Sequence, residues 1–404
     1  MAKTRVMIAG AGIAGTVLAY WLGKHDFEVV VLERGSFENH QGQIIDVEGP
    51  ARGVVERMGI LEELKLQSTK EESLTFVDAS GRPLASVTSG DTNLSNEIEI
   101  MRPVLVSTLI KAAQRFSNVS FRTSTTITSV QQSKESVTVE IEQRNGQAST
   151  ELFDFLVASD GLRSKTRNLV LPHDLAEGCL YPINAFAAFF SIPAKTGDRP
   201  HWRHYAFTER RAASIKPLDE KHSSAYLTIL KDDEELRSAR ESRDQKRQKE
   251  VVAGRFRDQG WECNRLVDAM LNAENFYFEE LCQVRLPEWS HGRCVLVGDT
   301  AYAPSPLTGE GTNLAIVGAY TLAWALIKHK DDLQQAFSAY ETHFRPYVNK
   351  VQPIPLGGYL PLLVNPDTAW GVWLLRKVLT IVGWLQPWKY LPVLQKSPYS
   401  LPEI

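Results

Sequence analysis

Hydrophobic residues near the start of the chain follow two different periods, one typical of a strand and one typical of a helix. A short apolar run at 5–9 predicts a buried strand. Apolar residues then recur at helical spacing, at Val17, Leu18, Trp21 and Leu22. A second apolar run, "EVVVLE" at 28–33, predicts another strand. The pattern therefore predicts a strand–helix–strand unit over residues 5–33.

Three glycines occupy the turn between the first strand and the helix, in the pattern G-x-G-x-x-G. Gly10 permits a tight turn, Gly12 lets the backbone approach a pyrophosphate, and Gly15 lets the helix pack closely on the strand. The helix N-terminus would face the phosphates, and Glu33 would accept hydrogen bonds from a ribose. The alternative is a glycine-rich turn without a ligand. The candidate cofactor-binding residues of this unit are Gly10, Gly12, Ala14, Gly15, Glu33 and Arg34.

Two further glycine–aspartate motifs follow apolar runs later in the chain. The first, D-G-x-x-S-x-x-R, comes directly after "FDFLVAS" and consists of Asp160, Gly161, Ser164 and Arg167. The second, "GDTAYAPSPLTGEGTN" at 298–313, lies between "CVLV" and a predicted helix. With three such motifs in this order, residues 1–345 resemble the single-component FAD-dependent aromatic hydroxylases of the p-hydroxybenzoate hydroxylase type. Within that family, the tetracycline-inactivating and fungal secondary-metabolite monooxygenases look closest.

The resemblance implies further residues that contact the flavin. Asp299 would bind a ribityl hydroxyl or approach the pyrophosphate, and the helix that starts near Gly311 would point its N–H groups at the flavin ring. Arg102 would contact the FAD phosphates or the ribityl chain, and Asp46 would lie beside the flavin. Alternatively, Arg102 could be a surface arginine and Asp46 could be a turn aspartate. The implied set is Asp46, Arg102, Asp160, Asp299, Pro306, Gly309, Gly311, Thr312 and Asn313.

Two positions depart from the family pattern. Tyr302 stands where histidine is usual, and Glu310 stands where glutamine is usual. In the family both positions border the flavin, so we expect these residues to tune the cofactor without changing its identity. A tyrosine stays neutral near pH 7, whereas a histidine titrates there.

The fold class that follows is α/β. We expect a Rossmann-like FAD-binding lobe with a glutathione-reductase-type parallel sheet, interleaved with an antiparallel-sheet substrate domain and followed by a C-terminal helix. A chain of 404 residues is too long for one compact core, which agrees with two lobes. Within the FAD-binding lobe, Asn145 and Gly146 predict a hairpin turn. We assign 1–72, 99–174 and 283–347 to the FAD-binding domain, 73–98 and 175–282 to the substrate domain, and 348–404 to a helical extension.

Successive strand-like segments between residues 175 and 230 predict a sheet. The resemblance implies that this sheet belongs to the substrate domain and covers the flavin. A pocket lined by its aromatic residues would suit an aromatic or polycyclic substrate. Any one of these aromatic residues could instead fill the core, and Arg211 could orient a phenolate or carboxylate or lie at the surface. The aromatic candidates are Phe186, Phe189, Trp202, Tyr205 and Tyr226, and the substrate-pocket set is Phe189, Tyr205, Arg211 and Tyr302.

Composition and charge argue against several other classes of protein. The net charge is −3 and the basic residues are scattered, so we expect no nucleic-acid partner. None of the four cysteines lies in a C-x-x-C pair, which argues against disulfides and a metal site. We find neither a signal peptide before the first motif nor an apolar run of about 18 residues, and we therefore expect a cytoplasmic protein. The charged segment 231–250 predicts a solvated helix face.

The last part of the chain has a different composition. The stretch "AWGVWLLRKVLTIVGWLQPWKYLPVL" has four tryptophans and few charges. One helical face, which must be buried, is formed by Trp370, Trp373, Leu374, Val378, Ile381 and Leu385. We expect this face to pack across the two lobes. Peripheral contact with a membrane surface or with a protein partner is the alternative.

The resemblance implies an FAD-dependent monooxygenase that uses NAD(P)H and O₂. NAD(P)H would reduce the flavin, and O₂ would then give the flavin C4a-hydroperoxide. This species would hydroxylate an aromatic or polycyclic small molecule, in secondary metabolism. The protein would supply position, a dry chamber and charge stabilisation, and no catalytic base can be assigned from the sequence. Baeyer–Villiger oxidation, epoxidation or oxidative cyclisation on the same fold is the alternative, and a flavin-binding sensor is the non-enzymatic one.

Overall fold

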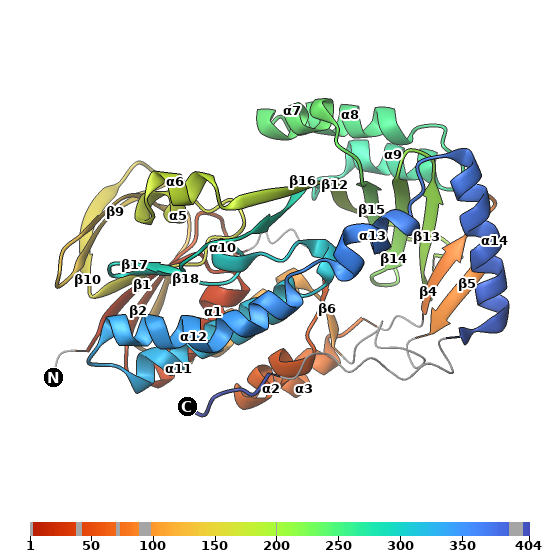
Figure 1. Cartoon of the computed structure of the whole chain (residues 1–404). Coiled ribbons are helices and arrows are strands. Elements are labelled where there is room, and N and C mark those ends of the chain that lie inside the picture. Colours follow the sequence, from red (N-terminus) through yellow and green to blue (C-terminus); the bar gives the residue numbers. More distant parts are fainter. Residues whose placement is uncertain (1–2, 38–42, 70–72, 89–97, 199, 388–398) are drawn as a thin grey trace.

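The structure is a computed structural model of the chain, and it describes residues 3–37, 43–69, 73–88, 98–198, 200–387 and 399–404. Figure 1 shows two lobes, connected at the top by the long strands β12 (Leu180–Pro193) and β16 (Tyr277–Val284). The chain passes between the lobes several times, so each lobe is assembled from separated segments. The predicted α/β fold class is confirmed.

The first lobe is built on a six-stranded sheet, in the order β17-β18-β11-β1-β2-β7. All neighbouring strands run parallel except β17, which is antiparallel to β18. The strands are β1 (Arg5–Ala9), β2 (Glu28–Leu32), β7 (Val119–Arg122), β11 (Phe155–Ala158), β17 (Ser290–His291) and β18 (Cys294–Leu296). The helix α1 (Ile13–Lys24) connects β1 to β2, which confirms the predicted strand–helix–strand unit.

Long helices bury the parallel sheet and complete the core of the first lobe. These helices are α1, α4 (Arg102–Ala113), α11 (Gly311–Lys328) and α12 (Leu333–Val351). Helix α11 packs between α1 and α12, and its buried residues extend around the whole helix because protein surrounds it. Helix α12 includes residue 347, the last residue that we assign to the FAD-binding domain.

A small antiparallel sheet stands at the outer end of the first lobe. It consists of β8 (Thr125–Gln132), β9 (Val137–Gln143) and β10 (Ala148–Phe153). Strands β9 and β10 form a hairpin in which Gly146 has a φ of +84°. A positive φ at this position favours glycine. The hairpin turn predicted at Asn145 and Gly146 is therefore confirmed.

The second lobe is built on a seven-stranded sheet in the order β16-β12-β15-β14-β13-β4-β5. Its other strands are β4 (Ser73–Val77), β5 (Pro83–Thr88), β13 (His201–Phe207), β14 (Arg211–Pro217) and β15 (His222–Ile229). One face packs against α7 (Glu234–Ser242), α8 (Gln245–Phe256) and α9 (Cys263–Asn272), and these layers enclose the second core. The strands predicted between residues 175 and 230 are confirmed.

The charged segment 231–250 forms parts of two helices instead of one. Arg243, between α7 and α8, has a φ of +56°, which interrupts the helix. The side chain of Asp244 then accepts hydrogen bonds from the backbone N–H groups of Lys246 and Arg247 and so caps α8. The expected solvated face is only partly observed, because some of these charged side chains form inward ion pairs.

Short elements connect the two lobes and carry several of the candidate residues. Strand β3 (Ile44–Asp46) pairs with β6 (Glu99–Met101). The remaining short elements are α2 (Gly49–Arg57), α3 (Leu61–Leu66), α5 (Lys165–Val170), α6 (His173–Glu177), α10 (Asp299–Tyr302) and the 3₁₀ helix η1 (Pro306–Thr308).

The C-terminal extension contacts both lobes, though not as predicted. After η2 (Pro355–Gly358) and α13 (Tyr359–Leu363), α14 (Ala369–Leu385) packs on the β5 edge of the second sheet (Figure 1). The expectation that its tryptophan-rich face packs across the lobes is wrong, because that face is exposed. Residues 399–404 instead return to the first lobe, where the Pro402 carbonyl accepts a 2.7 Å hydrogen bond from the Tyr320 hydroxyl.

Candidate functional site

The register of the parallel sheet places the three glycine motifs at one edge. Ala9 pairs with Ala158, and Ala158 pairs with Leu296, so β1, β11 and β18 end side by side. Each strand is followed within two residues by one of the predicted motifs. Ligands of open α/β sheets bind outside the carboxyl ends of the strands, which is where these motifs meet.

The N-terminal glycine turn leaves free space where a pyrophosphate would approach. Gly10 has a φ of +107°, and a Cβ there would lie 2.6 Å from the Ser159 carbonyl oxygen. A Cβ at Gly15 would clash with the backbone of Gly10, whereas a Cβ at Gly12 would have no atom within 4 Å. The glycine at residue 12 is therefore not required by the packing of the protein itself.

The acidic residue after the second strand stabilises this turn. The Glu33 carboxylate accepts hydrogen bonds from the backbone N–H groups of Ala11, at 3.1 Å, and Gly35, at 2.9 Å. Its predicted contact with a ribose stays a prediction. The neighbouring Arg34 is exposed, and Ala14 is buried, with its methyl group 2.9 Å from the position of a Cβ at Gly298. The N-terminal and late motifs are thus in contact.

The mid-chain motif uses its aspartate to stabilise a turn. Both carboxylate oxygens of Asp160 accept hydrogen bonds from protein groups, which are the Ser164 hydroxyl and the backbone N–H and hydroxyl of Thr166. The backbone N–H of Gly161 donates to the Thr300 hydroxyl at 2.9 Å. Asp160 therefore stabilises the backbone turn of this motif, and the Gly161 hydrogen bond connects the motif to the late one.

A buried arginine strengthens the connection between the mid-chain and late motifs. Arg167 is almost fully buried and donates hydrogen bonds to the carbonyl oxygens of Thr300 and Leu162, both at 3.0 Å. Arg167 belongs to the predicted motif, whereas Thr300 was not predicted. Thr300 could have been found only from the pairing of β11 with β18, because nothing in the local sequence identifies it.

The late motif presents a carboxylate and an uncapped helix end. Asp299 is exposed, yet the surrounding protein raises its pKa by burial, an effect that the Arg102 guanidinium partly offsets. This combination is typical of a side chain on the wall of a recess. Helix α11 begins at Gly311 without a side chain that caps it, and α1 also lacks one. Uncapped N-terminal N–H groups favour a bound anion or a group that develops negative charge.

The other residues of the late motif differ in their exposure to solvent. Pro306 and Gly309 are exposed and Gly311 is partly exposed, whereas Thr312 is buried. The buried Asn313 amide oxygen accepts a 3.1 Å hydrogen bond from the backbone N–H of Glu48, two residues after β3. It therefore fixes the segment that contains Asp46.

Glu310, where the family usually has glutamine, also interacts with Asn313. Its carboxylate accepts a hydrogen bond from the Asn313 side-chain amide at 3.2 Å. Burial raises the pKa of Glu310, the Asn313 amide lowers it, and the nearby Asp46 carboxylate raises it further. The two acidic groups therefore lie close enough to affect each other.

Tyr302 lies in the core of the first lobe and does not face an open substrate pocket. Its side chain is 1% exposed, and its hydroxyl is 3.0 Å from the Tyr340 hydroxyl. Burial raises its pKa above the usual range. Gly318 on α11 provides the necessary space, because a Cβ there would clash with the Tyr302 hydroxyl. The expectation that residue 302 lines the substrate pocket is thus corrected: Tyr302 is part of an aromatic cluster with Trp289 and Phe344.

The aromatic candidates on the second sheet fall on opposite faces. Phe189, Trp202 and Tyr226 lie on the face away from α7–α9; Phe189 is 5.5 Å from Tyr226 between ring centroids, and Trp202 is 6.4 Å from it. Phe186 and Tyr205 belong to the core beneath the helices. Because successive side chains of a strand alternate between faces, residues three positions apart cannot line the same face.

Arg211 also lies on the helix-covered face of the sheet. Its guanidinium donates hydrogen bonds to the carbonyl oxygens of Thr208 and Arg255, and it lies 4.9 Å from the centre of the Phe207 ring. The roles of Arg211 and Tyr205 in a substrate pocket are therefore corrected to structural ones. Of the four residues in the predicted pocket set, Phe189 lies on the face of the second sheet that points away from α7–α9.

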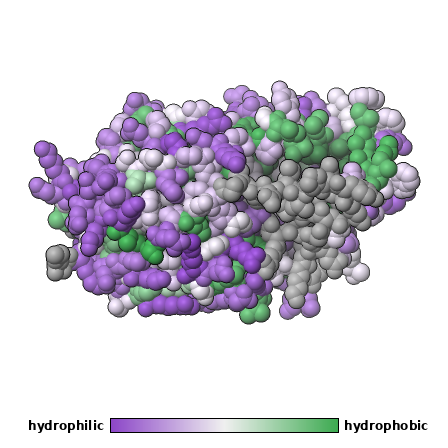
Figure 2. Space-filling view, turned by 60° about the horizontal axis from the view of Figure 1, so that its bottom comes forward, coloured by the Kyte–Doolittle hydropathy of each residue, from purple (hydrophilic) through white to green (hydrophobic). Residues whose placement is uncertain are grey.

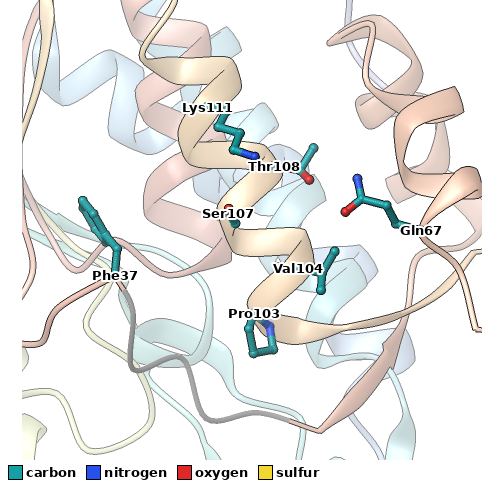
Figure 3. A pocket seen from close by; sticks show the side chains of 7 residues that line it. All are labelled: Phe37, Gln67, Pro103, Val104, Ser107, Thr108 and Lys111. Atoms are coloured by element: carbon teal, nitrogen blue, oxygen red, sulfur yellow. The ribbon is translucent and has the colours of Figure 1, made fainter. Parts of the chain in front are cut away.

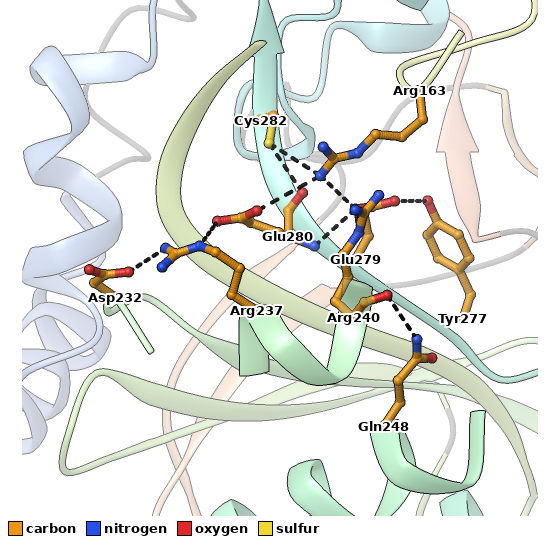
Figure 4. Close-up of polar contacts among 9 residues, drawn as sticks. All are labelled: Arg163, Asp232, Arg237, Arg240, Gln248, Tyr277, Glu279, Glu280 and Cys282. Carbon is orange, nitrogen blue, oxygen red and sulfur yellow. Dashed lines mark hydrogen bonds and ion pairs between the residues drawn. The ribbon is translucent and has the colours of Figure 1, made fainter. Parts of the chain in front are cut away.

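An ion-pair cluster lies where the two lobes meet (Figure 4). Glu279 forms ion pairs with Arg163, which lies within the mid-chain motif, at 3.0 Å, and with Arg240 of α7 at 2.8 Å. The Tyr277 hydroxyl donates a 3.5 Å hydrogen bond to Glu279. Arg237 pairs with the adjacent Glu280 at 3.0 Å. This cluster connects the second sheet to the first lobe.

Tyr277 brings the aromatic face close to the late motif. Its ring is 6.1 Å from the Phe189 ring, and its side chain is 47% exposed. Although the residue is exposed, the protein packed around it and the Glu279 carboxylate raise the pKa of its hydroxyl, while the Arg102 guanidinium lowers it. Arg102 therefore acts on both Asp299 and Tyr277. Tyr277 was not predicted, because the local sequence pattern contains no signal for it.

A shallow pocket runs beside α4 on the first lobe (Figure 3). It is lined by Phe37, Gln67, Pro103, Val104, Ser107, Thr108 and Lys111, and its volume is about 290 Å³. Binding sites for drug-sized ligands have volumes of roughly 300–1,000 Å³, so this pocket is small for a dinucleotide. The residues that fit a dinucleotide are those at the ends of β1, β11 and β18.

These features define a flavoprotein of the glycine-motif type. Open space over Gly12, the Asp299 carboxylate and two uncapped helix ends fit a pyrophosphate, a polyol and an electron-accepting ring. Residues 3–352 match the FAD binding domain family, and the chain belongs to this family. It is therefore an FAD-dependent monooxygenase, as the following relatives indicate.

Two curated relatives are similar over most of this chain. Monooxygenase CTB7 of Cercospora beticola is 38% identical over 397 residues, which cover 96% of this chain and 94% of the relative. A flavin-dependent monooxygenase of Legionella longbeachae is 31% identical over 350 residues, which cover 86% of this chain and 87% of the relative.

Solved structures show the same architecture. Tetracycline destructase Tet(55) is 29% identical, with a TM-score of 0.77, over 100% of this chain and 99% of that chain. Tetracycline destructase Tet(51) has the same TM-score at 26% identity, over 100% of both chains. The prediction of an FAD-dependent monooxygenase is confirmed.

Proposed function

We propose that this monooxygenase uses NAD(P)H and O₂ to hydroxylate an aromatic or polycyclic small molecule. The observation that carries the proposal is the continuous aromatic surface formed by Phe189, Trp202, Tyr226 and Tyr277 on the second sheet. Tyr277 connects this surface to Arg102 and the late motif. A flat aromatic substrate held there would lie between the aromatic surface and the cofactor.

The residues at the ends of the parallel strands would hold FAD, which supplies the redox and oxygen-transfer chemistry when bound. The N–H groups at the start of α1 would bind the pyrophosphate, and Asp299 would accept hydrogen bonds from the ribityl chain. The start of α11 would stabilise negative charge on the flavin ring. Glu33 and Asp160 act through the backbone turns that they stabilise.

The relatives support a polycyclic substrate class. Two structures of similar architecture are named as tetracycline destructases, and tetracycline is a fused polycycle. Aromatic side chains offer large apolar surfaces that stack on such rings. The substrate of this chain is proposed to share that chemistry, and its role in secondary metabolism is part of the same proposal.

The test begins with the purified protein and its cofactor. Acid precipitation should release FAD, and NADH and NADPH oxidation should accelerate when candidate aromatic or polycyclic substrates are added. Reaction under oxygen-18 gas should place one labelled oxygen atom in a hydroxyl group of the product. A labelled ester, lactone or epoxide would show that the enzyme catalyses another monooxygenase reaction instead of hydroxylation. An unlabelled product would contradict the proposal.

A pair of variants then tests the aromatic surface. Phe189→Ala should raise the KM for the substrate while FAD content stays at the wild-type level. Tyr181→Ala is the matched control, because Tyr181 lies on the same strand but its exposed ring contacts Arg285 instead of this surface. Equal KM values for both variants and the wild type would show that the substrate binds elsewhere.

A further inference from the structure

The outer face of the C-terminal helix is the most apolar exposed surface that the described residues form. Trp370, Trp373 and Trp384 of α14 are 68%, 54% and 83% exposed. The same face of α14 also exposes Leu374, Val378, Ile381 and Leu385, and the neighbouring segment exposes Leu356, Tyr359, Leu360 and Leu363. Figure 2 shows hydrophobic side chains gathered at this end of the molecule. An apolar patch of this kind indicates a binding surface.

Specific contacts on the inner side hold α14 in this orientation. A Cβ at Gly383 would clash with the Leu84 carbonyl oxygen of β5, so the helix backbone lies directly against the sheet edge. Arg376 donates a 3.3 Å hydrogen bond to the Tyr205 hydroxyl, and Val372 is buried. The Thr368 hydroxyl caps the helix through the backbone N–H of Gly371 at 3.1 Å. The tryptophans therefore point outward because small and buried residues occupy the inner side.

The sequence between Asp367 and Glu403 has a net charge that is opposite in sign to that of the whole chain. Between Asp367 and Glu403 the sequence contains four basic residues, Arg376, Lys377, Lys389 and Lys396, and no acidic residue. The formal charge of the whole protein is −3. Lys377 lies on the exposed side of α14, with its ammonium 5.9 Å from the centre of the Trp373 ring. A surface that combines exposed tryptophans with lysine fits a layer of apolar chains beneath anionic headgroups.

We propose that the outer face of α14, together with α13, docks on a lipid surface that contains anionic headgroups. Tryptophan rings are enriched at the boundary between headgroups and hydrocarbon, and lysine reaches from that depth back to the phosphates. Among the described residues, no helix is long and apolar enough to cross a membrane. The contact is therefore peripheral, with the helix axis parallel to the lipid surface and the second sheet above it.

A second copy of the chain fits this face less well than lipid. A twofold interface would place the same patch on both partners, so Lys377 of one copy would lie in the same basic and apolar patch as Lys377 of the other. With no acidic residue between 368 and 402 to neutralise them, this arrangement would bring like charges together. Anionic headgroups provide the missing opposite charge.

The test uses the full-length FAD-bound protein with vesicles of phosphatidylcholine alone or mixed with phosphatidylserine. The protein should sediment with the mixed vesicles, less with phosphatidylcholine alone, and less as NaCl is raised. Trp370→Ser/Trp373→Ser/Trp384→Ser should reduce the partition coefficient by at least roughly tenfold, because each lost ring removes buried apolar area. Lys377→Gln should reduce it by roughly fivefold on mixed vesicles only.

A matched control tests whether vesicle binding depends on this face or on exposed hydrophobic residues in general. Leu66→Ser/Leu152→Ser removes two exposed hydrophobic side chains from the first lobe and should leave sedimentation unchanged. All variants should keep the wild-type FAD content and far-ultraviolet circular dichroism, since the changed side chains are exposed. Failure of the wild type to sediment with either vesicle, or equal sedimentation of the triple variant, would overturn the proposal. A concentration-dependent dimer that the triple variant abolishes, without vesicle binding, would assign the face to a second copy.

Discussion

His204 should make the folded protein sensitive to acid over a defined range. On β13 its Nδ1 lies 2.8 Å from the Ser214 hydroxyl, and its buried Nε2 has no hydrogen-bond partner among the described residues. Burial lowers the pKa of His204 from 6.5 to about 4, because a charged ring there would lose its hydration. The native state therefore prefers the neutral imidazole.

The expected magnitude follows from the two pKa values. The unfolded chain binds a proton at about pH 6.5, whereas the native chain binds it only near pH 4, so the unfolded state holds more protons in between. The free energy of unfolding therefore falls as the pH drops through this window. The full difference corresponds to roughly 3 kcal/mol, of which roughly 2 kcal/mol should be lost between pH 7 and pH 4.5.

Urea unfolding at about pH 7 and pH 4.5, at one fixed FAD concentration, measures this loss. His204→Gln keeps a polar side chain but does not titrate, so its free energy of unfolding should fall by roughly 2 kcal/mol less than that of the wild type. His222→Gln is the control, because His222 is exposed beside Asp219. If His204→Gln and the wild type lost the same free energy over this interval, His204 would already be charged or solvated in the native state.

Three other regions give testable expectations. Gly12→Val should fold with a near-native melting temperature but lose FAD, whereas Gly15→Val should fail to fold stably; circular dichroism and flavin absorbance distinguish the two. Tyr302→Phe should keep FAD and lower the free energy of unfolding by about 1 kcal/mol, measured in urea, because the hydrogen bond between the buried Tyr302 and Tyr340 hydroxyls is lost. Deletion of residues 399–404 should lower the melting temperature and speed the release of FAD on dilution, measured by flavin fluorescence, because these residues pack on the first lobe.

Local motifs made the cofactor side of the site predictable. The turn at Gly10 and the uncapped start of α11 depend on residues that are close in sequence, so their conformations follow from short patterns. Contacts between the motifs were not predictable in this way. The hydrogen bond from Gly161 to Thr300 exists because β11 pairs with β18 in one particular register.

The sequence predicted that aromatic residues line the second sheet, but not which of them share one face of it. Phe186 and Phe189 are three residues apart, as are Trp202 and Tyr205, so one residue of each pair had to face the helices. The single sequence could not decide which, because both faces of the sheet are rich in apolar residues. The pairing of Phe189 with Tyr226, and the helices α7–α9 on the opposite face, settle the choice.

The orientation of α14 shows why apolar area alone did not predict the buried face of this helix. Large hydrophobic residues extend around most of α14, so a rule that buries the most apolar stripe selects the tryptophans. Close packing on a sheet edge instead requires a small residue where the two backbones meet, and Gly383 supplies it against Leu84. Gly383→Leu should therefore displace the helix from β5 and destabilise the second lobe. Trp384→Ser, one residue away on the opposite side, should leave the melting temperature unchanged. Equal melting temperatures for these two variants would mean that the glycine contact does not set the orientation.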